Sequence, residues 1–302
     1  MNHFCTISTA SHLYKVHALA DSLRNQHPDF VMHVLVVDDN SNFFSENCRY
    51  WKLTDIGSSE NAQAIINKYK NNNDKLRWSL KPVFLKYLLQ REAIDQLIYL
   101  DNDLYFFSSY QFLFDLLGKH SFLLTPHYYK HDPGKDQNWL EANFRVGLFN
   151  AGFVGVNKNA LNTLQWWADC CKYRCEKNSF RGLFDDQKYL DLVPVIEKDS
   201  LILRHKGCNV AGWNTELCQR EIINHQIRIE KEFPIVFIHF NDTTIREIIS
   251  GKDEILFNFY RDYLETLKKY KPELKEKELL FEQPWTVKIK FGLWKILTEY
   301  GI

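Results

Sequence analysis

Two aspartates stand one residue apart directly after an apolar run, in the stretch QLIYLDNDLYFF. The β-branched and aromatic residues before Asp101 and Asp103 predict a buried strand, so the pair is expected at the carboxyl end of that strand. Paired carboxylates at such a place need a cation to neutralise them. Mn²⁺ and Mg²⁺ accept carboxylate and phosphate oxygens together. The motif therefore indicates a divalent-metal site. The alternative is a solvated strand end capped by Asn102 and Asp103.

Three later segments carry polar groups that would complete such a site. Asn150 and Gly152 interrupt the apolar strand FNAGFVGVN, which either lets a ligand approach the backbone or marks a bulge. The segment FDDQKYLD places Asp186 and Gln187 at a helix start, where they either face a ligand or cap the helix. His239 ends the strand VFIHF and is either a third metal ligand or a buried core histidine.

Length and composition exclude several functional classes. The chain has 302 residues, of which 45% are hydrophobic and 25% charged, as in a soluble globular protein. Lys+Arg and Asp+Glu both total 38, so no broad basic surface for nucleic acid is expected. No apolar run is long enough to span a membrane, and the first residues lack a signal-peptide pattern. We therefore expect a cytoplasmic protein.

The seven cysteines form no CxxC pair, which argues against a zinc ribbon or a disulfide framework. Cys171 and Cys175 have a helical spacing and could share a metal, but small buried thiols are the favoured interpretation.

Strands that alternate with helices predict an α/β fold, with a mostly parallel central sheet flanked by helices. Strands are expected at 3–9, 31–39, 96–103, 121–127, 148–157, 201–205 and 234–240. Helices are expected at 12–26, 80–92, 112–118, 160–175 and 184–194, with a loop-rich region up to about residue 75. We predict one main domain over 1–250, with one half at about 1–108 and the other at about 109–250. A helical C-terminal extension is predicted over 251–302.

The order of these motifs over roughly residues 3 to 245 resembles the metal-dependent GT-A glycosyltransferases, whose fold is Rossmann-like. The resemblance is greatest to the retaining family 8 group, which includes glycogenin and bacterial lipopolysaccharide galactosyl- and glucosyltransferases. It implies transfer of a sugar from a nucleotide-diphosphate donor, with UDP as the nucleotide, to a glycan or glycolipid acceptor. The domain over 1–250 would then be catalytic, with the donor bound by the half at about 1–108 and the acceptor by the half at about 109–250. It also implies a role in surface polysaccharide or lipopolysaccharide synthesis. In this resemblance Mn²⁺ or Mg²⁺ is held by Asp101, Asp103 and His239.

The resemblance also implies roles for further residues. The implied donor-binding residues are Thr6, Ser8, Tyr14, Lys81, Asp101, Asn102, Asp103, Gly152 and Arg246. Those implied beside the reacting sugar are Asn150, Asp186 and Gln187. The polar loop ILRHKGCNVAGWN resembles a bacterial subgroup of the superfamily, and we expect it near the acceptor or the donor sugar through Arg204, His205, Asn209 and Asn214.

Three positions differ from the family pattern. Ala151 stands in place of Ser, and Lys188 in place of a second acidic residue. After His239 the chain reads FNDTTIREI and lacks the family's Gly and Lys-Pro-Trp, which leaves Arg246 as the substitute for the usual diphosphate-binding Lys. The resemblance favours retention of configuration, while Asp186 as the base of an inverting reaction stays open.

The C-terminal stretch 284–302 mixes Trp and Phe with Lys, as helices at a membrane surface do. It is either a peripheral contact with the inner face of a membrane or a helix docked on the catalytic domain. Two rival functions remain. A phosphatase of the haloacid-dehalogenase type needs a small or hydroxyl residue soon after the second aspartate, where Leu104 and Tyr105 stand. The other is an inactive GT-A-like module that binds a nucleotide or glycan.

Overall fold

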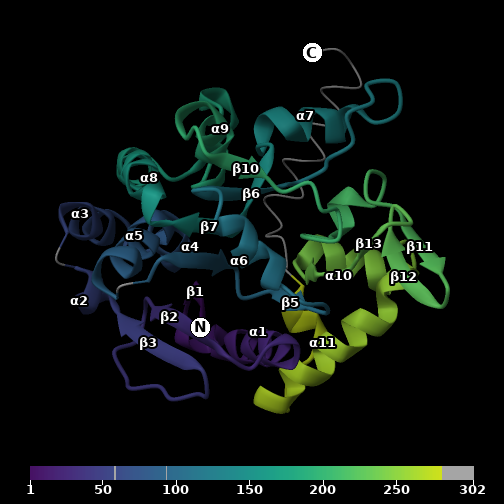
Figure 1. Ribbon diagram of the computed structural model, residues 1–302, viewed down its shortest axis with the longest axis horizontal. Coiled ribbons are helices and arrows are strands. Elements are labelled where there is room, and N and C mark those ends of the chain that lie inside the picture. Colours follow the sequence, from purple (N-terminus) through teal and green to yellow (C-terminus); the bar gives the residue numbers. More distant parts are fainter. Residues whose placement is uncertain (58, 93, 281–302) are drawn as a thin grey trace.

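The computed structural model describes residues 1–57, 59–92 and 94–280, whose central feature is a seven-stranded sheet (Figure 1). The strand order is β10-β6-β7-β4-β1-β2-β3. The strands are β1 Asn2–Ser8, β2 Phe30–Val36, β3 Cys48–Lys52, β4 Gln96–Leu100, β6 Phe122–Pro126, β7 Phe149–Asn157 and β10 Ser200–Ile202. Strand β7 is antiparallel to β4 and β6, and the other pairs are parallel. This confirms the predicted α/β fold with a mostly parallel sheet.

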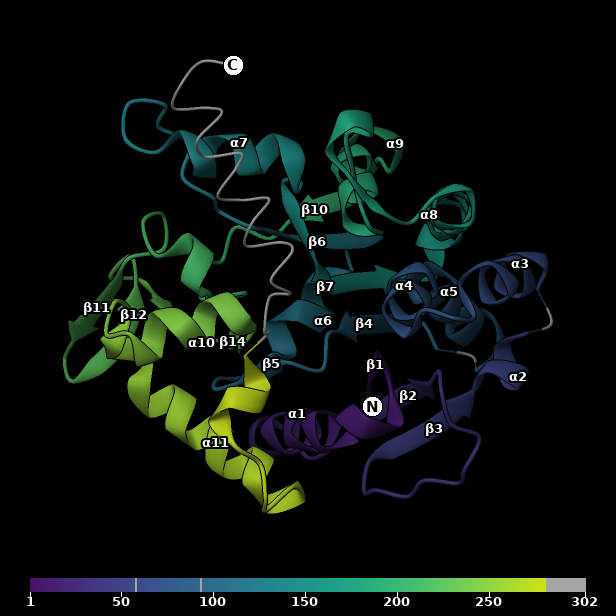
Figure 2. The same cartoon turned by 180° about the vertical axis from the view of Figure 1, so that it is seen from behind.

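Helices cover both faces of the sheet (Figure 2). One face is covered by α2 Leu53–Ile56, α3 Glu60–Tyr69, α4 Asn73–Ser79, α5 Lys81–Arg91, α8 Leu161–Tyr173 and α9 Val193–Ile196. The other face is covered by α1 Leu13–Gln26 and α6 Gln111–Leu117. The side chains of β4 alternate between the two cores, with Leu97 and Tyr99 in one and Ile98 and Leu100 in the other. Both faces of β4 are therefore buried, as its apolar sequence predicted.

Local sequence signals explain where several of these helices begin. Pro82 lies in the first turn of α5, where its missing N–H breaks no helical hydrogen bond. The side chain of Asn72 accepts a hydrogen bond from Lys75 N and caps α4, and Ser59 caps α3 in the same way. Helices α3 and α4 thus form in the region for which the sequence predicted mainly loops.

A second group of elements packs beside the carboxyl end of the sheet. Strand β5, Leu104–Phe106, follows the aspartate pair and is antiparallel to β14, Phe237–His239. Next to them lie a three-stranded sheet and two helices, which are β11 Arg220–Ile223, β12 Gln226–Ile229, β13 Phe233–Pro234, α10 Asp242–Ile249 and α11 Phe257–Tyr270. Helix α11 packs on α1, where Lys269 and Tyr270 both contact Asp21 Oδ2 at 2.7 Å.

The remaining elements are short. They are η1 Ala10–His12, α7 Gln137–Arg145, η2 Lys158–Ala160, β8 Lys177–Asn178, η3 Ser179–Arg181, β9 Leu183–Phe184, η4 Gln187–Leu192, η5 Gly212–Asn214, η6 Glu254–Leu256 and η7 Glu276–Leu279. The helix expected at 184–194 is formed by η4 followed by α9. Among the described residues, no helix combines the length and the apolar character needed to cross a membrane. The C-terminal stretch 284–302, for which membrane contact was predicted, lies outside the described residues.

Candidate metal and donor site

The aspartate pair and the distant histidine meet at the carboxyl end of β4. Asp101, Asp103 and His239 each offer one ligand atom, and these atoms lie within 4.8 Å of one another. The pairing of β5 with β14 produces this meeting, because His239 stands opposite Leu104 in the register. A backbone hydrogen bond also links the two segments, since Phe240 N donates to Asp103 O at 2.8 Å. Two carboxylates and one imidazole form a donor set suited to a divalent cation.

Gly152 leaves room for this cluster. A Cβ atom at position 152 would lie 2.6 Å from Asn150 Oδ1, 2.8 Å from His239 Cε1 and 3.0 Å from Asp101 Oδ2. Asp101 N donates to Gly152 O at 2.7 Å, so β7 is fixed beside the aspartates. A side chain at position 152 would therefore displace two of the three candidate ligands. The space around Asp101 and His239 fits a bound ion.

Asp103 and His239 each favour the charged form of the other. His239 Nε2 lies 3.1 Å from Asp103 Oδ1. Burial lowers the pKa of His239, but the facing carboxylates of Asp103 and Asp101 outweigh it, so the pKa is raised above its ordinary value. Burial raises the pKa of Asp103, but the charges of His239 and Lys15 lower it by more. The pKa of Asp103 therefore lies well below its usual range. Asp103 is therefore ionised at neutral pH, as a metal ligand must be.

A buried lysine lies between the first aspartate and a third carboxylate. Lys81 Nζ lies 3.3 Å from Asp101 Oδ1 and 3.4 Å from Asp186 Oδ2, and it donates to Ala151 O at 3.0 Å. Burial raises the pKa of Asp186 to about 7, a shift that the Lys81 charge only partly opposes and that Asp101 increases. Lys81 itself has a raised pKa, because Asp101 and then Asp186 outweigh its burial. Asp101 is thus the stronger of the two counter-charges that act on Lys81, and Asp186 is only partly ionised near neutral pH.

Asn150 and Gln187 hold the segment that carries Gly152. Asn150 Oδ1 accepts from Gly152 N at 2.7 Å, and Gln187 Oε1 accepts from Ala151 N at 3.1 Å. His127 Nδ1 lies 3.0 Å from Gly147 O, which requires a proton on Nδ1, so Nε2 accepts from Asn150 Nδ2 at 3.3 Å. Burial lowers the pKa of His127 to about 3, so this imidazole is neutral. These side chains fix the strand that borders the metal candidate.

The predicted residues of β1 and α1 lie on the other side of the aspartate pair. Asn102 Nδ2 donates to Ser8 Oγ at 3.1 Å, which ties the Asp-Asn-Asp turn to the carboxyl end of β1. Thr6 is buried, and its Oγ1 has no hydrogen-bond partner among the described residues. The Tyr14 ring is stacked with His12 and lies 5.2 Å from the Nζ atom of Lys271. Ser8 and Asn102 are thus linked directly to the aspartate turn, while Tyr14 faces α11.

The polar loop after β10 divides into two parts. Asn209 is fully buried, has φ +62°, and its side-chain nitrogen and oxygen have no hydrogen-bond partner among the described residues. Val210 pairs with Ile238, so Asn209 lies next to the strand that carries His239. Asn214 is also buried, but its amide accepts from Ala211 N and donates to Asn209 O. The amide of Asn209 is therefore buried without a hydrogen-bond partner among the described residues, whereas that of Asn214 is satisfied within its own loop.

Three predicted residues lie farther from this cluster. Arg204 is exposed. The His205 ring packs between Phe112 and Phe233, at 5.2 and 4.7 Å between ring centroids. Arg246 is on α10, and its Nε contacts both carboxylate oxygens of Asp242 at 2.9 and 3.0 Å. None of the interactions described for these three side chains reaches Asp101, Asp103 or His239.

Four residues beside the cluster were missed in the sequence. Tyr99 Oη donates to Asp101 Oδ1 at 2.8 Å, and the Trp213 ring meets His239 edge-on, with centroids 5.2 Å apart. The charge of Asp103 also acts on Lys15, and that of Asp101 on Arg77. Tyr99 belongs to the same strand as the motif, and its position two residues before Asp101 places both side chains on one face. The other three come from separate elements, so their proximity could not be read from the sequence.

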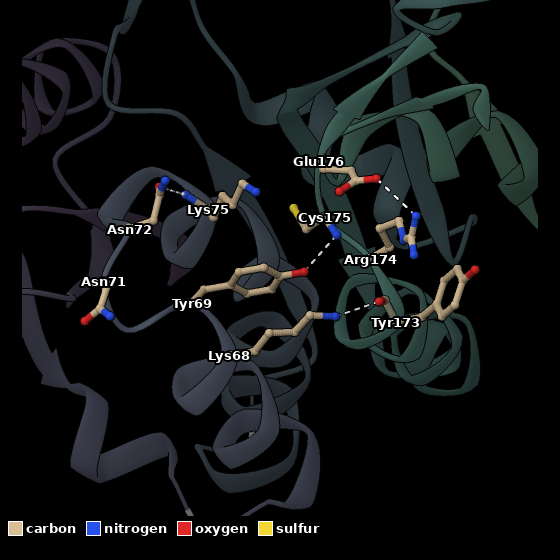
Figure 3. A pocket seen from close by; sticks show the side chains of 9 residues that line it. All are labelled: Lys68, Tyr69, Asn71, Asn72, Lys75, Tyr173, Arg174, Cys175 and Glu176. Carbon is tan, nitrogen blue, oxygen red and sulfur yellow. Dashed lines mark hydrogen bonds and ion pairs between the residues drawn. The ribbon is translucent and has the colours of Figure 1, made fainter. Parts of the chain in front are cut away.

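A cavity of about 440 Å³ lies apart from these residues (Figure 3). Its lining comes from the end of α3, the start of α4 and the segment after α8. Several of its polar groups already bind one another, since Lys68 donates to Tyr173 O at 2.7 Å and Cys175 N donates to the Tyr69 hydroxyl at 2.9 Å. The cavity is a junction between helices, and none of the predicted site residues lines it.

Comparison with known proteins identifies relatives over most of the chain. No family model matches the chain. The chain is similar to two uncharacterized proteins of Bacillus subtilis strain 168. YfnD is 28% identical over 266 residues, which cover 86% of this chain and 82% of YfnD. YfnF is 25% identical over 254 residues, which cover 81% of this chain and 82% of YfnF.

The solved structures to which the chain is similar include three named as glycosyltransferases. Mouse xyloside xylosyltransferase 1 in its apo form has a TM-score of 0.47 and 15% identity, with 80% of this chain and 98% of that chain covered. The galactosyltransferase LgtC, in complex with donor and acceptor sugar analogs, also has a TM-score of 0.47 and 15% identity, with 78% and 86% covered. GlyE of Streptococcus pneumoniae TIGR4 has a TM-score of 0.45 and 15% identity, with 79% and 54% covered.

Proposed function

We propose that this protein is a metal-dependent glycosyltransferase that moves a sugar from a nucleotide-diphosphate donor, a UDP-sugar, to a hydroxyl group of a glycan or glycolipid. The observation that carries the proposal is the convergence of Asp101, Asp103 and His239 within 4.8 Å beside Gly152. Asp101, Asp103 and His239 would hold Mn²⁺ or Mg²⁺, which when bound neutralises the charge that grows on the leaving diphosphate.

The side chains around this cluster account for the rest of the chemistry. The amino group of Lys81 holds the Asp101 side chain in place from its buried side. Asn150 and Gln187 fix the backbone of β7, so the donor sugar would lie against a rigid wall rather than a mobile loop. Asp186 is buried behind Lys81, with little room for the water or acceptor that an inverting base must contact. This placement supports retention, in which the leaving phosphate takes the acceptor proton.

The decisive experiment measures release of the nucleoside diphosphate from a panel of nucleotide sugars with Mn²⁺. The wild-type protein should hydrolyse or transfer one donor, and both EDTA and Asp103→Ala should abolish this activity. Asp115→Ala, which removes an exposed carboxylate from α6, is the matched control and should remain active. Full activity of Asp103→Ala in the presence of EDTA would refute the metal assignment. Donor binding without turnover by the wild-type protein would instead support the inactive binding module.

The same experiment yields the stereochemistry. NMR of the first product gives the anomeric configuration before mutarotation, and we expect it to match that of the donor. An inverted product would require a base beside the acceptor, and Asp186 would be the first residue to test.

A further inference from the structure

The cavity between the end of α3, the start of α4 and the segment after α8 has more positive than negative charge in its lining. Its volume is about 440 Å³. The charged side chains of the lining are Lys68, Lys75, Arg174 and Glu176. The two segments that form it, 68–75 and 172–176, contain five basic and two acidic residues, whereas the whole chain carries no net charge. Positive charge is therefore concentrated at this cavity, and such a cavity attracts anions.

Hydrogen bonds between α3 and the end of α8 fix the walls of the cavity. The Tyr69 hydroxyl donates to Cys171 O at 3.4 Å and accepts from Cys175 N at 2.9 Å, which holds the ring in one position. Lys68 Nζ donates to Tyr173 O at 2.7 Å across the same junction. The cavity is thus formed by the protein alone, and a ligand would have to order little of the chain in order to bind.

The amino group of Lys75 is a cation that no carboxylate of the described residues contacts. Among those residues it makes no hydrogen bond, and no carboxylate oxygen lies within 4.0 Å of it. Lys75 Nζ lies 6.0 Å from the centroid of the Tyr69 ring, and Lys68 Nζ lies 5.4 Å from the same centroid. The carboxylate of Asp74, next to Lys75 in the sequence, instead contacts Arg77 Nη2 at 2.5 Å. Two ammonium groups therefore lie near one ring, and neither contacts a described carboxylate.

Arg174 supplies a third positive charge from the opposite wall. Figure 3 shows Arg174 and Glu176 across the cavity from Lys75. Arg174 Nη1 donates to Glu176 Oε1 at 3.3 Å, and Asn178 Nδ2 donates to the same oxygen at 3.2 Å. The other N–H groups of the Arg174 side chain have no hydrogen-bond partner among the described residues. A guanidinium group with free N–H groups is suited to the oxygens of a phosphate.

We propose that this cavity binds a phosphate group, either as inorganic phosphate or as a phosphate monoester. A phosphate monoester carries nearly two negative charges at neutral pH and three strong acceptor oxygens. These oxygens match the donors of Lys68, Lys75 and Arg174, which approach from different elements. A carboxylate has one charge and two oxygens, so it satisfies fewer of the three cations. A divalent cation is repelled by them.

The phosphate site is separate from the metal and donor site, but its wall is linked to the segment that carries Asp186. Asp185 N donates to Glu176 O at 3.1 Å, and Lys177 Nζ lies 3.5 Å from Asp185 Oδ2. A phosphate in the cavity would therefore contact an element that borders the proposed sugar site without occupying the metal cluster. The inference depends on the cavity and its cations alone, and it does not require the glycosyltransferase function.

The test is isothermal titration with inorganic phosphate, glycerol 3-phosphate and acetate at constant ionic strength. EDTA is present so that no metal contributes to binding. The wild-type protein should bind both phosphate probes saturably and acetate more weakly. Lys75→Gln and Arg174→Gln should each weaken phosphate binding by about tenfold or more, the usual loss of a hydrogen bond between charged groups. Lys119→Gln, which removes an exposed charge after α6, is the control and should stay within about twofold.

Amide NMR of the wild-type protein locates the anion without a variant, in case Lys75→Gln or Arg174→Gln is unstable. Inorganic phosphate should shift the signals of residues 68–75 and 173–176. Shifts confined to the residues around Lys81 and Asp101 would place the anion in the metal and donor site and overturn the inference.

Vesicle flotation identifies the source of the phosphate group. The vesicles contain phosphatidylcholine alone or an equal mixture of phosphatidylcholine and phosphatidic acid. Flotation with the mixture that Lys75→Gln loses would identify a lipid headgroup as the ligand, and binding of glycerol 3-phosphate without flotation would identify a soluble monoester. The inference is wrong if the wild type binds no phosphate probe in solution or on vesicles. Acetate binding as tight as that of phosphate, or an equal loss in Lys119→Gln, would also overturn it.

Discussion

The amino group of Lys81 lies 3.4 Å from Oδ2 of Asp186, and both side chains are almost completely buried, at 3% exposure each. Asp101 lies at a similar distance from the same amino group. One positive charge thus lies between two carboxylates. Asp101 is the more exposed of the two carboxylates and belongs to the candidate metal cluster, while Asp186 has its pKa raised to about 7, mainly by burial.

This arrangement predicts an unusual dependence of stability on pH. Asp186 has a folded-state pKa of about 7, against about 3.9 for an exposed aspartate, so between these values the folded protein holds a proton that the unfolded chain has released. The free energy of unfolding should therefore fall as the pH rises from about 4 to about 7. Asp186→Asn removes this titration. The free energy of unfolding of this variant, relative to that of the wild type, should therefore increase as the pH rises from about 4 to about 7. Urea unfolding of both proteins at pH 5 and pH 8 tests this. A difference in stability between variant and wild type that does not change with pH would contradict the raised pKa of Asp186.

Removal of the shared cation should have the opposite effect. Lys81→Met leaves two carboxylates facing each other around a buried site, which should cost about 3–5 kcal/mol in the free energy of unfolding at neutral pH. The loss should be smaller at pH 5, because protonation of Asp186 removes one of the two charges. Lys86→Met lies on the same helix, and its amino group contacts Gln165 rather than a carboxylate. If both variants lose the same stability, the charge of Lys81 is not the cause.

Gly152 and Gly155 offer a matched pair of substitutions within β7. In Gly152→Ala the new methyl group would approach His239 and Asp101, so Mn²⁺ affinity should fall by at least tenfold. In Gly155→Ala it would meet Leu123 at 3.1 Å in the core, so the main effect should be lower stability, about 1–3 kcal/mol, with metal affinity preserved. Mn²⁺ titration and thermal unfolding of both variants separate the two effects. A Gly152→Ala protein that binds Mn²⁺ normally would exclude this location for the ion.

Asn209 and Asn214 provide a test of the sugar side. Asn209→Gly suits the positive φ of this position and breaks no side-chain hydrogen bond, so the fold should keep its stability while transfer activity falls. Asn214→Ala removes three side-chain hydrogen bonds, to Ala211, Asn209 and Arg220, so it should lower the free energy of unfolding by about 1–3 kcal/mol. Transfer activity and the free energy of unfolding should both be measured for the two variants. Unchanged kinetics in Asn209→Gly would mean that its amide does not contact a ligand.

The sheet was readable from the sequence because its strands are continuous apolar runs. The bounds of β1, β4, β6 and β7 lie close to the predicted ranges, and α1, α5 and α8 follow their helical periodicity. The segment up to residue 75 was misjudged as mainly loops. It contains β3, a five-residue edge strand with the mixed sequence CRYWK, whose burial depends on packing against β2 and α5 rather than on an apolar pattern.

The candidate site could be predicted where its residues belong to a recognisable sequence motif. Asp101, Asp103 and His239 were predicted to meet and do so, because each stands at the end of an apolar strand. The surroundings depend on tertiary packing. Lys81 was expected on the nucleotide side, and the structure places its amino group between Asp101 and Asp186. Lys15 carries no local signal, since a lysine in an amphipathic helix is usually just a solvated residue.

The pairing of β5 with β14 also has a consequence for the order of events during synthesis. The aspartates leave the ribosome long before the histidine, which joins them when β14 pairs with β5. A nascent or truncated polypeptide ending before Phe237 would contain the carboxylates without the imidazole. We expect such fragments to bind Mn²⁺ more weakly than the full chain, because one of the three candidate ligands is missing.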